Sequence, residues 1–190
     1  MTKRSFAGYL CEESLSVGLF GECFRAENKQ GIRARITVVD QRLSQRKRFA
    51  SALARYGSKL SSLVHPNIVT TEKIGKGKDG VLVVIASAVE APVELRALME
   101  WSGSLPSEIA LNIALGVLRG LSHAHQNQVV HGGVHPRSVL LDAQGVSKVS
   151  DFGLARAFAS AAADAEDSEL LSGLRGYVAP ELALGQEPDQ

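Results

Sequence analysis

Histidine is the residue type in this sequence whose spacing most invites chemistry. The chain has five histidines. His123 and His125 are separated by one residue, and His131 and His135 by three, which are spacings that zinc ligands can have. Neither cysteine lies near these histidines in the sequence. Spacing alone is a weak signal, so we expect no metal site formed by the histidines.

Composition limits the classes to which the protein can belong. Its 190 residues, 45% of them hydrophobic and 22% charged, indicate one globular domain, or one domain with part of another. A balance of 21 Lys and Arg against 20 Asp and Glu argues against a nucleic-acid binder. No apolar run is long enough for a membrane span or a signal peptide, so we expect a cytoplasmic protein. Cys11 and Cys23 are expected to be reduced thiols on adjacent strands.

Positive charge is concentrated near the N-terminus. The first 60 residues hold 12 Lys and Arg against 5 Asp and Glu. Within them, apolar residues from Phe49 to Leu63 recur at spacings of three and four, which predicts a helix with an opposite basic face. That face is either a solvated surface or a site for an acidic partner or an anionic surface. The candidate partner residues are Arg46, Lys47, Arg48, Arg55 and Lys59.

The elements that would position these residues are mostly strands first and helices later. Patterning predicts strands at 8–11, 22–26 and 32–39, a helix at 42–63, and a strand pair at 68–74 and 80–89. It then predicts helices at 94–101 and 107–125, followed by short strands at 129–130, 138–141 and 146–149.

Three details complete this outline. Ser104 or Ser107 would cap the longer helix at its N-terminus. Leu111, Leu115, Leu118 and Leu121 lie on one side of that helix. Residues 157–169 are rich in alanine and acidic residues and are expected to form a mobile loop.

The order of elements and several short motifs resemble a protein kinase, particularly the bacterial eukaryotic-like Ser/Thr kinases. Asp151-Phe152-Gly153 matches the motif that opens the family's activation segment, and Ala179-Pro180-Glu181 matches the motif that closes it. The run from His131 to Ser138 stands where the family has its catalytic loop, and His65-Pro66-Asn67 follows the first helix as expected. The resemblance covers about residues 8–187.

The resemblance implies that most positions for phosphoryl transfer are substituted. Of the glycine-rich loop, Gly18 and Gly21 remain as vestigial nucleotide-binding residues, while Ser16 replaces the first glycine. Thr37 replaces the lysine that pairs with phosphate, and Arg35 replaces the small alanine that packs on adenine. Because residues two apart in a strand share a face, both should face the cleft.

The partners of that lysine in the family are altered in the same way. Tyr56 falls at the helix glutamate that holds the lysine, and packing is its expected role. The lysine and the glutamate are expected to be lost together, because either one without the other would be an unpaired buried charge, which is costly.

The catalytic loop departs furthest from the family. Gly133 replaces the catalytic aspartate, His135 the lysine that steadies the transferred phosphate, and Ser138 the asparagine that ligates Mg²⁺. Leu174 replaces an activation-segment threonine. Asp151 remains as a candidate metal ligand, although one carboxylate makes a weak Mg²⁺ site.

The retained motif residues have structural roles in the family. His131 and Phe152, together with Leu60, match its internal hydrophobic stack, and Gly153 and Glu181 complete the structural motifs.

We therefore expect an α+β, two-lobed kinase-like fold. Residues 1–90 would form a β-rich N-lobe with one helix, and 91–190 a helical C-lobe truncated after the activation segment. The pattern of losses predicts a pseudokinase and not an enzyme: a signalling or scaffold domain with no cofactor and weak or absent binding of ATP and Mg²⁺. The alternative is an atypical ATP-binding Ser/Thr kinase with weak or displaced catalysis.

The expected partner is a protein or a second copy of the chain; no nucleic acid is expected as a partner, and no membrane segment is expected in this chain. The chain ends nine residues after Glu181. An exposed apolar base on the second lobe would favour association, because soluble monomers rarely expose large apolar patches.

Overall fold

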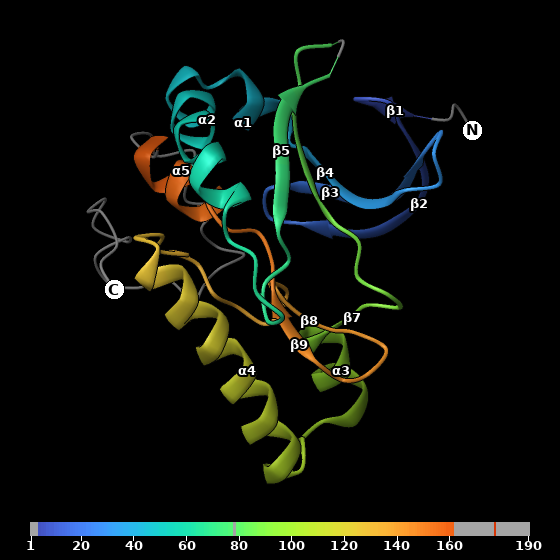
Figure 1. Ribbon diagram of the computed structural model, residues 1–190, viewed down its shortest axis with the longest axis vertical. Coiled ribbons are helices and arrows are strands. Elements are labelled where there is room, and N and C mark those ends of the chain that lie inside the picture. Colours follow the sequence, from blue (N-terminus) through green and yellow to red (C-terminus); the bar gives the residue numbers. More distant parts are fainter. Residues whose placement is uncertain (1–3, 78, 162–176, 178–190) are drawn as a thin grey trace.

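The N-terminal part of the chain forms a curled antiparallel sheet of six strands in the order β1-β2-β3-β4-β6-β5 (Figure 1). The computed structural model describes residues 4–77, 79–161 and 177. The strands are β1 Ser5–Phe6, β2 Tyr9–Gly18, β3 Gly21–Asn28, β4 Arg33–Val39, β5 Thr71–Lys76 and β6 Leu82–Ser87. The predicted strands correspond to β2 to β6, whereas β1 was not expected.

Strand β4 has the alternation that its sequence predicts. Ala34 and Ile36 are fully buried in an apolar cluster with Phe24 and Ile85. Arg35 and Thr37 point to the other face of the sheet, where they line a cavity. The sheet therefore presents its polar residues to the second part of the molecule.

The predicted helix at 42–63 is two helices, α1 Gln41–Gln45 and α2 Lys47–Ser61. Arg46 between them is extended, with φ −75° and ψ 108°. Asp40 caps α1 by accepting a 2.8 Å hydrogen bond from the Arg42 backbone N–H. The apolar stripe of α2 is buried as predicted, with Phe49 and Leu53 fully enclosed.

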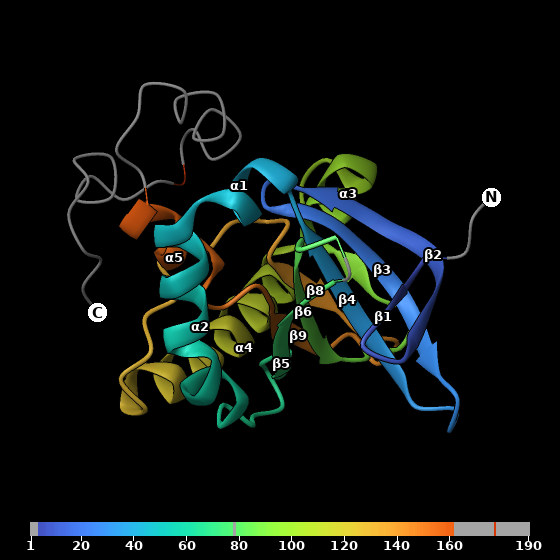
Figure 2. The ribbon, with the colours of Figure 1, turned by 90° about the horizontal axis from the view of Figure 1, so that it is seen from above.

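Helix α5, Leu154–Ala161, corrects the expectation of a loop from 157 onward. Alanine favours helix, and the apolar side of α5 gives it a reason to form here. Ala157 and Phe158 are buried in one cluster with Leu53 and Phe20. Figure 2 shows α5 beside α2 on the same side of the sheet.

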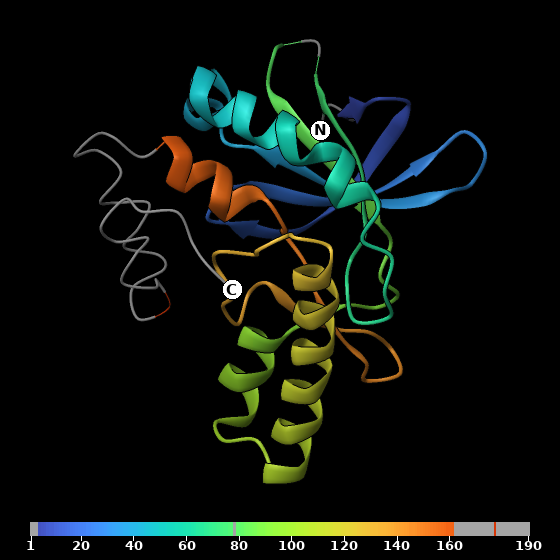
Figure 3. The ribbon, with the colours of Figure 1, turned by 60° about the vertical axis from the view of Figure 1, so that its left-hand side comes forward.

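Apart from α5, the described residues of the second part of the chain form two helices and a three-stranded sheet. The helices are α3 Leu95–Ser102 and α4 Ser107–Gln126, which lie together beneath the first sheet (Figure 3). The small sheet has the order β7-β8-β9, with β7 Val93–Glu94, β8 Val139–Leu141 and β9 Ser147–Val149. Residues 129–130 form no strand, and β7 was not predicted.

Helix α4 buries a different face from the one that its leucines suggest. Its buried residues are Ile113, Gly116, Gly120 and Ala124, whereas Leu111 is 63% and Leu118 60% exposed. Small residues let another segment approach the helix axis closely. The N-cap is Pro106 and makes no side-chain cap, so the predicted serine cap is wrong.

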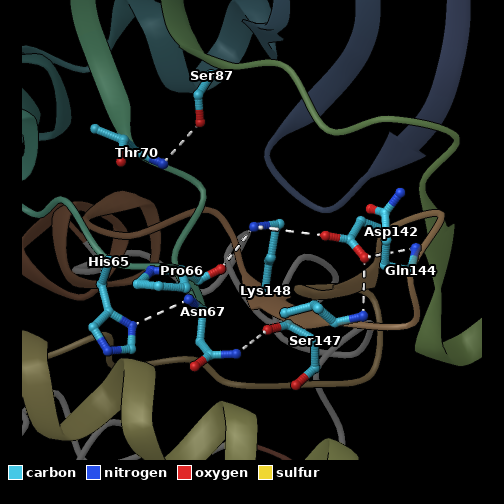
Figure 4. Close-up of polar contacts among 10 residues, drawn as sticks. His65, Pro66, Asn67, Thr70, Ser87, Asp142, Gln144, Ser147 and Lys148 are labelled. Atoms are coloured by element: carbon cyan, nitrogen blue, oxygen red, sulfur yellow. Dashed lines mark hydrogen bonds and ion pairs between the residues drawn. The ribbon is translucent and has the colours of Figure 1, made fainter.

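The segment packed against those glycines joins the two sheets (Figure 4). The Asn67 side-chain amide donates to the Ser147 carbonyl at 2.8 Å. The backbone of Asn67 and Val69 pairs with Val149 through two bonds of 2.9 Å. Lys148 Nζ donates to the Pro66 carbonyl at 2.7 Å. This junction fixes the position of the first sheet above α4.

Several residues of the sequence analysis lie outside the described ranges. They are Leu174, Glu181 with the rest of its motif, residues 162–169 of the expected loop, and the chain end.

Two helix glycines should respond oppositely to alanine. A Cβ at Gly120 would lie 2.6 Å from the Asn67 carbonyl oxygen, so Gly120→Ala should lower the free energy of unfolding by ~1–3 kcal/mol. A Cβ at Gly57 in α2 would meet only Ile74 at 3.6 Å, so Gly57→Ala should raise it by ~0.5–1 kcal/mol through helix propensity. Urea unfolding measures the change in the free energy of unfolding for each variant. Changes of the same sign in both variants would contradict the packing described for α4.

Candidate functional site

The predicted site residues meet in a cleft between the first sheet and the second part of the chain. A cavity of about 30 Å³ lies there. Its lining includes the sheet residues Gly18, Gly21, Cys23, Arg35 and Thr37 and, from the second part, Glu94, His135, Arg137 and Asp151. Residues more than 100 positions apart in the sequence therefore face one small space.

Gly21 has a structural explanation in the turn that closes β2 and β3. Gly18 and Gly21 are paired at the end of the hairpin. Gly21 has φ +145°, and a Cβ on it would overlap the backbone of Val38. The glycine therefore allows the turn to pack against β4, whether or not a phosphate lies beneath it.

Arg35 stands at the position where the resemblance places a small residue. Its side chain is only 8% exposed, although it carries a charge. Nearby, Cys23 on β3 lies directly opposite Thr37 on β4 and lines the same cavity. Burial raises the pKa of the Cys23 thiol, and the positive charge of Arg35 opposes the rise. The thiol is therefore protonated at neutral pH.

His131 is held in one tautomer by two hydrogen bonds. Its Nε2 lies 2.8 Å from the Ser150 carbonyl and must donate to it, while its Nδ1 accepts from the Gly133 N–H at 3.2 Å. The ring meets Phe152 edge-on, with centroids 4.7 Å apart. Burial lowers the pKa of His131, so the neutral form is favoured.

The rest of the catalytic-loop segment bonds mainly to itself. His135 Nδ1 accepts from the backbone N–H groups of Arg137 and Ser138 at 3.1 and 3.2 Å. The Ser138 hydroxyl donates to the His135 carbonyl at 2.9 Å, and the side chain is fully buried. Burial also lowers the pKa of His135, against the opposing charge of Asp151. These side chains stabilise the turn.

Gly133 cannot be replaced by a larger residue without movement of a neighbour. A Cβ there would lie 2.6 Å from the Ala155 Cβ in α5. The position where the resemblance places an aspartate is thus closed by the helix that follows Asp151. The structure and the substitution agree, because α5 occupies the space that a longer side chain would need.

Asp151 has an uncommon backbone and one close side-chain partner. Its φ is +63°, and its carboxylate accepts from the Ser150 hydroxyl at 3.1 Å. Glu94 lines the same cavity. Among described residues no group of three or more His, Cys, Asp or Glu could hold a metal ion. Two carboxylates and a cavity of about 30 Å³ do not fit Mg²⁺ with a nucleotide in this conformation.

Arg137 connects the two parts of the molecule across the cleft. Its Nη1 donates to the Val17 carbonyl, next to Gly18, at 2.8 Å. Sequence reasoning did not identify Arg137 or Glu94 as cleft residues. No spacing pattern could have found this contact, because the two residues are 120 positions apart.

The remaining predicted residues lie on or beside α2. Tyr56 packs against two apolar clusters, and the Arg156 guanidinium lies 4.9 Å from its ring centroid. Leu60 and Phe152 share a cluster, which places them with His131 as the resemblance implies. The basic side chains Lys47, Arg48, Arg55 and Lys59 are exposed, while Arg46 is half-buried.

Comparison with known proteins places these residues in context. The family model described as "Protein kinase domain" matches residues 9–189. Serine/threonine-protein kinase PrkC of Bacillus subtilis is 36% identical over 72% of this chain and 20% of its own length. PknB of Mycobacterium leprae is 28% identical over 81% of this chain and 25% of its own. The chain thus spans about a fifth to a quarter of the length of these relatives.

A solved structure shows the same fold. A double mutant of the PknI kinase domain of Mycobacterium tuberculosis has a TM-score of 0.78, with 22% identity, over 100% of this chain and 71% of that one. The predicted two-lobed fold class is confirmed. In the described part of the chain, no helix is long and apolar enough to cross a membrane.

These relatives correct two expectations. Both curated relatives are named as serine/threonine-protein kinases, and the family model is that of a kinase domain. The expectation that the chain is not an enzyme is therefore wrong. The expectation of no cofactor is contradicted as well, because kinases of this family use ATP and Mg²⁺. Both errors came from judging activity by substituted positions alone.

Three histidines, one buried and two half-buried, should make the fold sensitive to mild acid. Burial lowers the pKa of His65, His131 and His135 below the ordinary value of 6.5. The unfolded chain then binds more protons than the folded chain as the pH falls through 6.5. The free energy of unfolding should accordingly be highest above pH 6.5, as far as these histidines determine it, and should decrease as the pH falls below 6.5.

Urea unfolding at pH 7.5 and 5.5 measures this effect. His131→Gln should lower stability at pH 7.5 but should reduce the loss between the two pH values. An identical loss in the wild type and the variant would show that His131 does not titrate with unfolding.

Proposed function

Because the chain belongs to the protein kinase family, we propose that it is an atypical ATP-binding Ser/Thr kinase domain whose cleft opens before it takes a nucleotide. The observation that carries the proposal is the hydrogen bond from Arg137 to the Val17 carbonyl across the cleft. It ties the β2–β3 hairpin to the second part of the molecule while the cavity beneath holds only about 30 Å³.

Opening of the cleft would cost little free energy if the Arg137–Val17 hydrogen bond is the main contact that is lost. The bond between Arg137 and Val17 is exposed to water, so its net contribution is about 1 kcal/mol. A protein that binds ligand only in its open form has an apparent affinity reduced by the open fraction. The contact therefore lowers nucleotide affinity without removing any group that touches the nucleotide.

The residues present also set how phosphoryl transfer would be supported. Asp151 and Glu94 are the carboxylates that line the cavity, and only in the opened cleft would they be available to a metal ion. When bound, Mg²⁺ supplies charge neutralisation for the phosphates. Without a lysine at position 37 or an aspartate at 133, we expect slow transfer.

Removal of the cross-cleft contact should strengthen nucleotide binding. Arg137→Ala should bind Mg-ATP about fivefold more tightly than the wild type, since ~1 kcal/mol of closure is lost. Isothermal titration calorimetry measures both affinities. Arg119→Ala, which removes an exposed arginine from α4, is the matched control and should bind as the wild type does. No detectable binding at millimolar Mg-ATP in either the wild type or Arg137→Ala would refute the proposal.

Activity is tested separately in the Arg137→Ala background. Transfer of labelled phosphate to a generic protein substrate should be measurable there, and adding Asp151→Asn should reduce it at least tenfold. Binding without transfer would limit the function to nucleotide binding. Transfer that survives Asp151→Asn would contradict the role proposed for this carboxylate.

We also propose that the exposed face of α2 binds an acidic protein partner. In the described ranges, Lys47, Arg48, Arg55 and Lys59 form no ion pair with any carboxylate. Four uncompensated cations on one helix produce a positive potential that attracts acidic segments. The basic face does not line the cleft, so such binding is compatible with nucleotide binding.

Charge reversal tests the basic face. An octaglutamate peptide should bind the wild type in low salt, and Arg48→Glu with Arg55→Glu should weaken this at least tenfold, measured by fluorescence anisotropy. Lys73→Glu on β5, which lowers the net charge by two units elsewhere, half the change in the double variant, should have a much smaller effect. An equal effect would mean that only overall charge matters.

A further inference from the structure

A second, larger cavity adjoins the small one at Arg35. Its volume is about 480 Å³. It is enclosed by the first sheet and by the linker that follows β6, and its lining residues are Leu15, Arg25, Arg33, Ala34, Arg35, Ala88, Val89, Glu90 and Ala91. Three of these are arginines, and Arg35 lines both this cavity and the smaller one.

Strand register brings the three arginines together. Arg25 on β3 is directly opposite Arg35 on β4. Arg33 is two residues from Arg35 on the same strand, so its side chain is on the same face. The sheet therefore directs a row of guanidinium groups toward the cavity.

Two of these arginines have acidic partners and the third does not. Arg25 is ion-paired with Glu13 at 3.0 Å, and Arg33 with Glu27 at 3.5 Å. Among the described residues, no carboxylate forms an ion pair with Arg35, and no hydrogen bond of its guanidinium is found. Yet Arg35 is more than nine-tenths buried.

A buried charge without a partner is costly, and an anion in the cavity would offset that cost. Guanidinium groups bind carboxylates and phosphates through paired hydrogen bonds, which makes either group a suitable ligand. The remaining wall is largely apolar: Leu15, Ala34, Ala88, Val89 and Ala91 supply it. The exposed carboxylate of Glu90 is the one acidic group in the lining.

We propose that this cavity binds a small anionic molecule, whose carboxylate or phosphate accepts hydrogen bonds from Arg35 and whose apolar body packs against Leu15 and Val89. The site shares the cleft with the proposed nucleotide site but does not depend on ATP binding. A ligand of this kind would fix Arg35 between the two cavities, so it would compete with a nucleotide that needs the same space.

Matched probes test the chemistry of the ligand. Benzoate should bind at least tenfold more tightly than benzamide, which has the same ring without the charge, as measured by calorimetry. Phenyl phosphate separates the two anion types: tighter binding than benzoate indicates a phosphate ligand, and weaker binding a carboxylate ligand. Equal affinity for benzoate and benzamide, or no binding of benzoate and phenyl phosphate at millimolar concentration, would overturn the proposal.

Variants of Arg35 test the site itself. Arg35→Ala should weaken binding of the better anion at least tenfold, and Arg35→Lys should restore part of it. Arg42→Ala removes an exposed arginine that lines neither cleft cavity, so it should leave the affinity unchanged. Unchanged affinity in Arg35→Ala would show that the anion binds elsewhere.

A second variant covers the case in which Arg35→Ala does not fold. Glu90→Gln removes a negative charge from the cavity lining, and this charge repels an anion. The variant should bind the anion about threefold more tightly and should bind benzamide as the wild type does. An unchanged affinity for the anion would count against binding in this cavity. Failure of this proposal is distinguishable from failure of the proposed function, because Mg-ATP binding by the Arg137→Ala chain is measured without these probes.

Discussion

The segment around Asn67 is the contact on which the rest of the structure depends. Its side chain and backbone pair with Ser147 and Val149, and it lies against the glycines of α4. The amide and the backbone groups are buried, so each unmade hydrogen bond there would cost ~1–3 kcal/mol. Because this junction sets the height of the first sheet above the second, it also sets the width of the cleft.

Within that cleft, the substitutions form a consistent physical arrangement. Arg35 occupies space that a small residue would leave open, and α5 closes on Gly133. His131 and Ser138 use their polar atoms to hold the loop. The cleft therefore has a small cavity near Asp151, where two carboxylates and two arginines meet, and a larger cavity with three arginines. Such a division changes which molecules fit, while the family's backbone is preserved.

Much of this fold could be predicted from sequence, because strand alternation and the α2 stripe are local signals. The alternation in β4 correctly placed Ile36 in the core and Arg35 in the cleft. The buried face of α4 could not be predicted, since Leu111 and Leu118 are more apolar than Gly116 and Gly120. Close approach of Asn67 decided that face. For the site, motif positions indicated Asp151, but Arg137 and Glu94 required the three-dimensional structure, because their partners are distant in sequence.

The raised pKa of Cys23 has a consequence for reagents that attack thiols. Only the thiolate is nucleophilic, so alkylation of a protonated, enclosed sulfur is slow. Cys23 lines the same small cavity as Asp151, and any separation of the β2–β3 hairpin from the second part would hydrate it. The rate of Cys23 alkylation would therefore report how often the cleft opens, and its measurement needs no attached dye. Cys11, buried among Phe24 and Ile36 on the other face of the sheet, is an internal reference for loosening of the core.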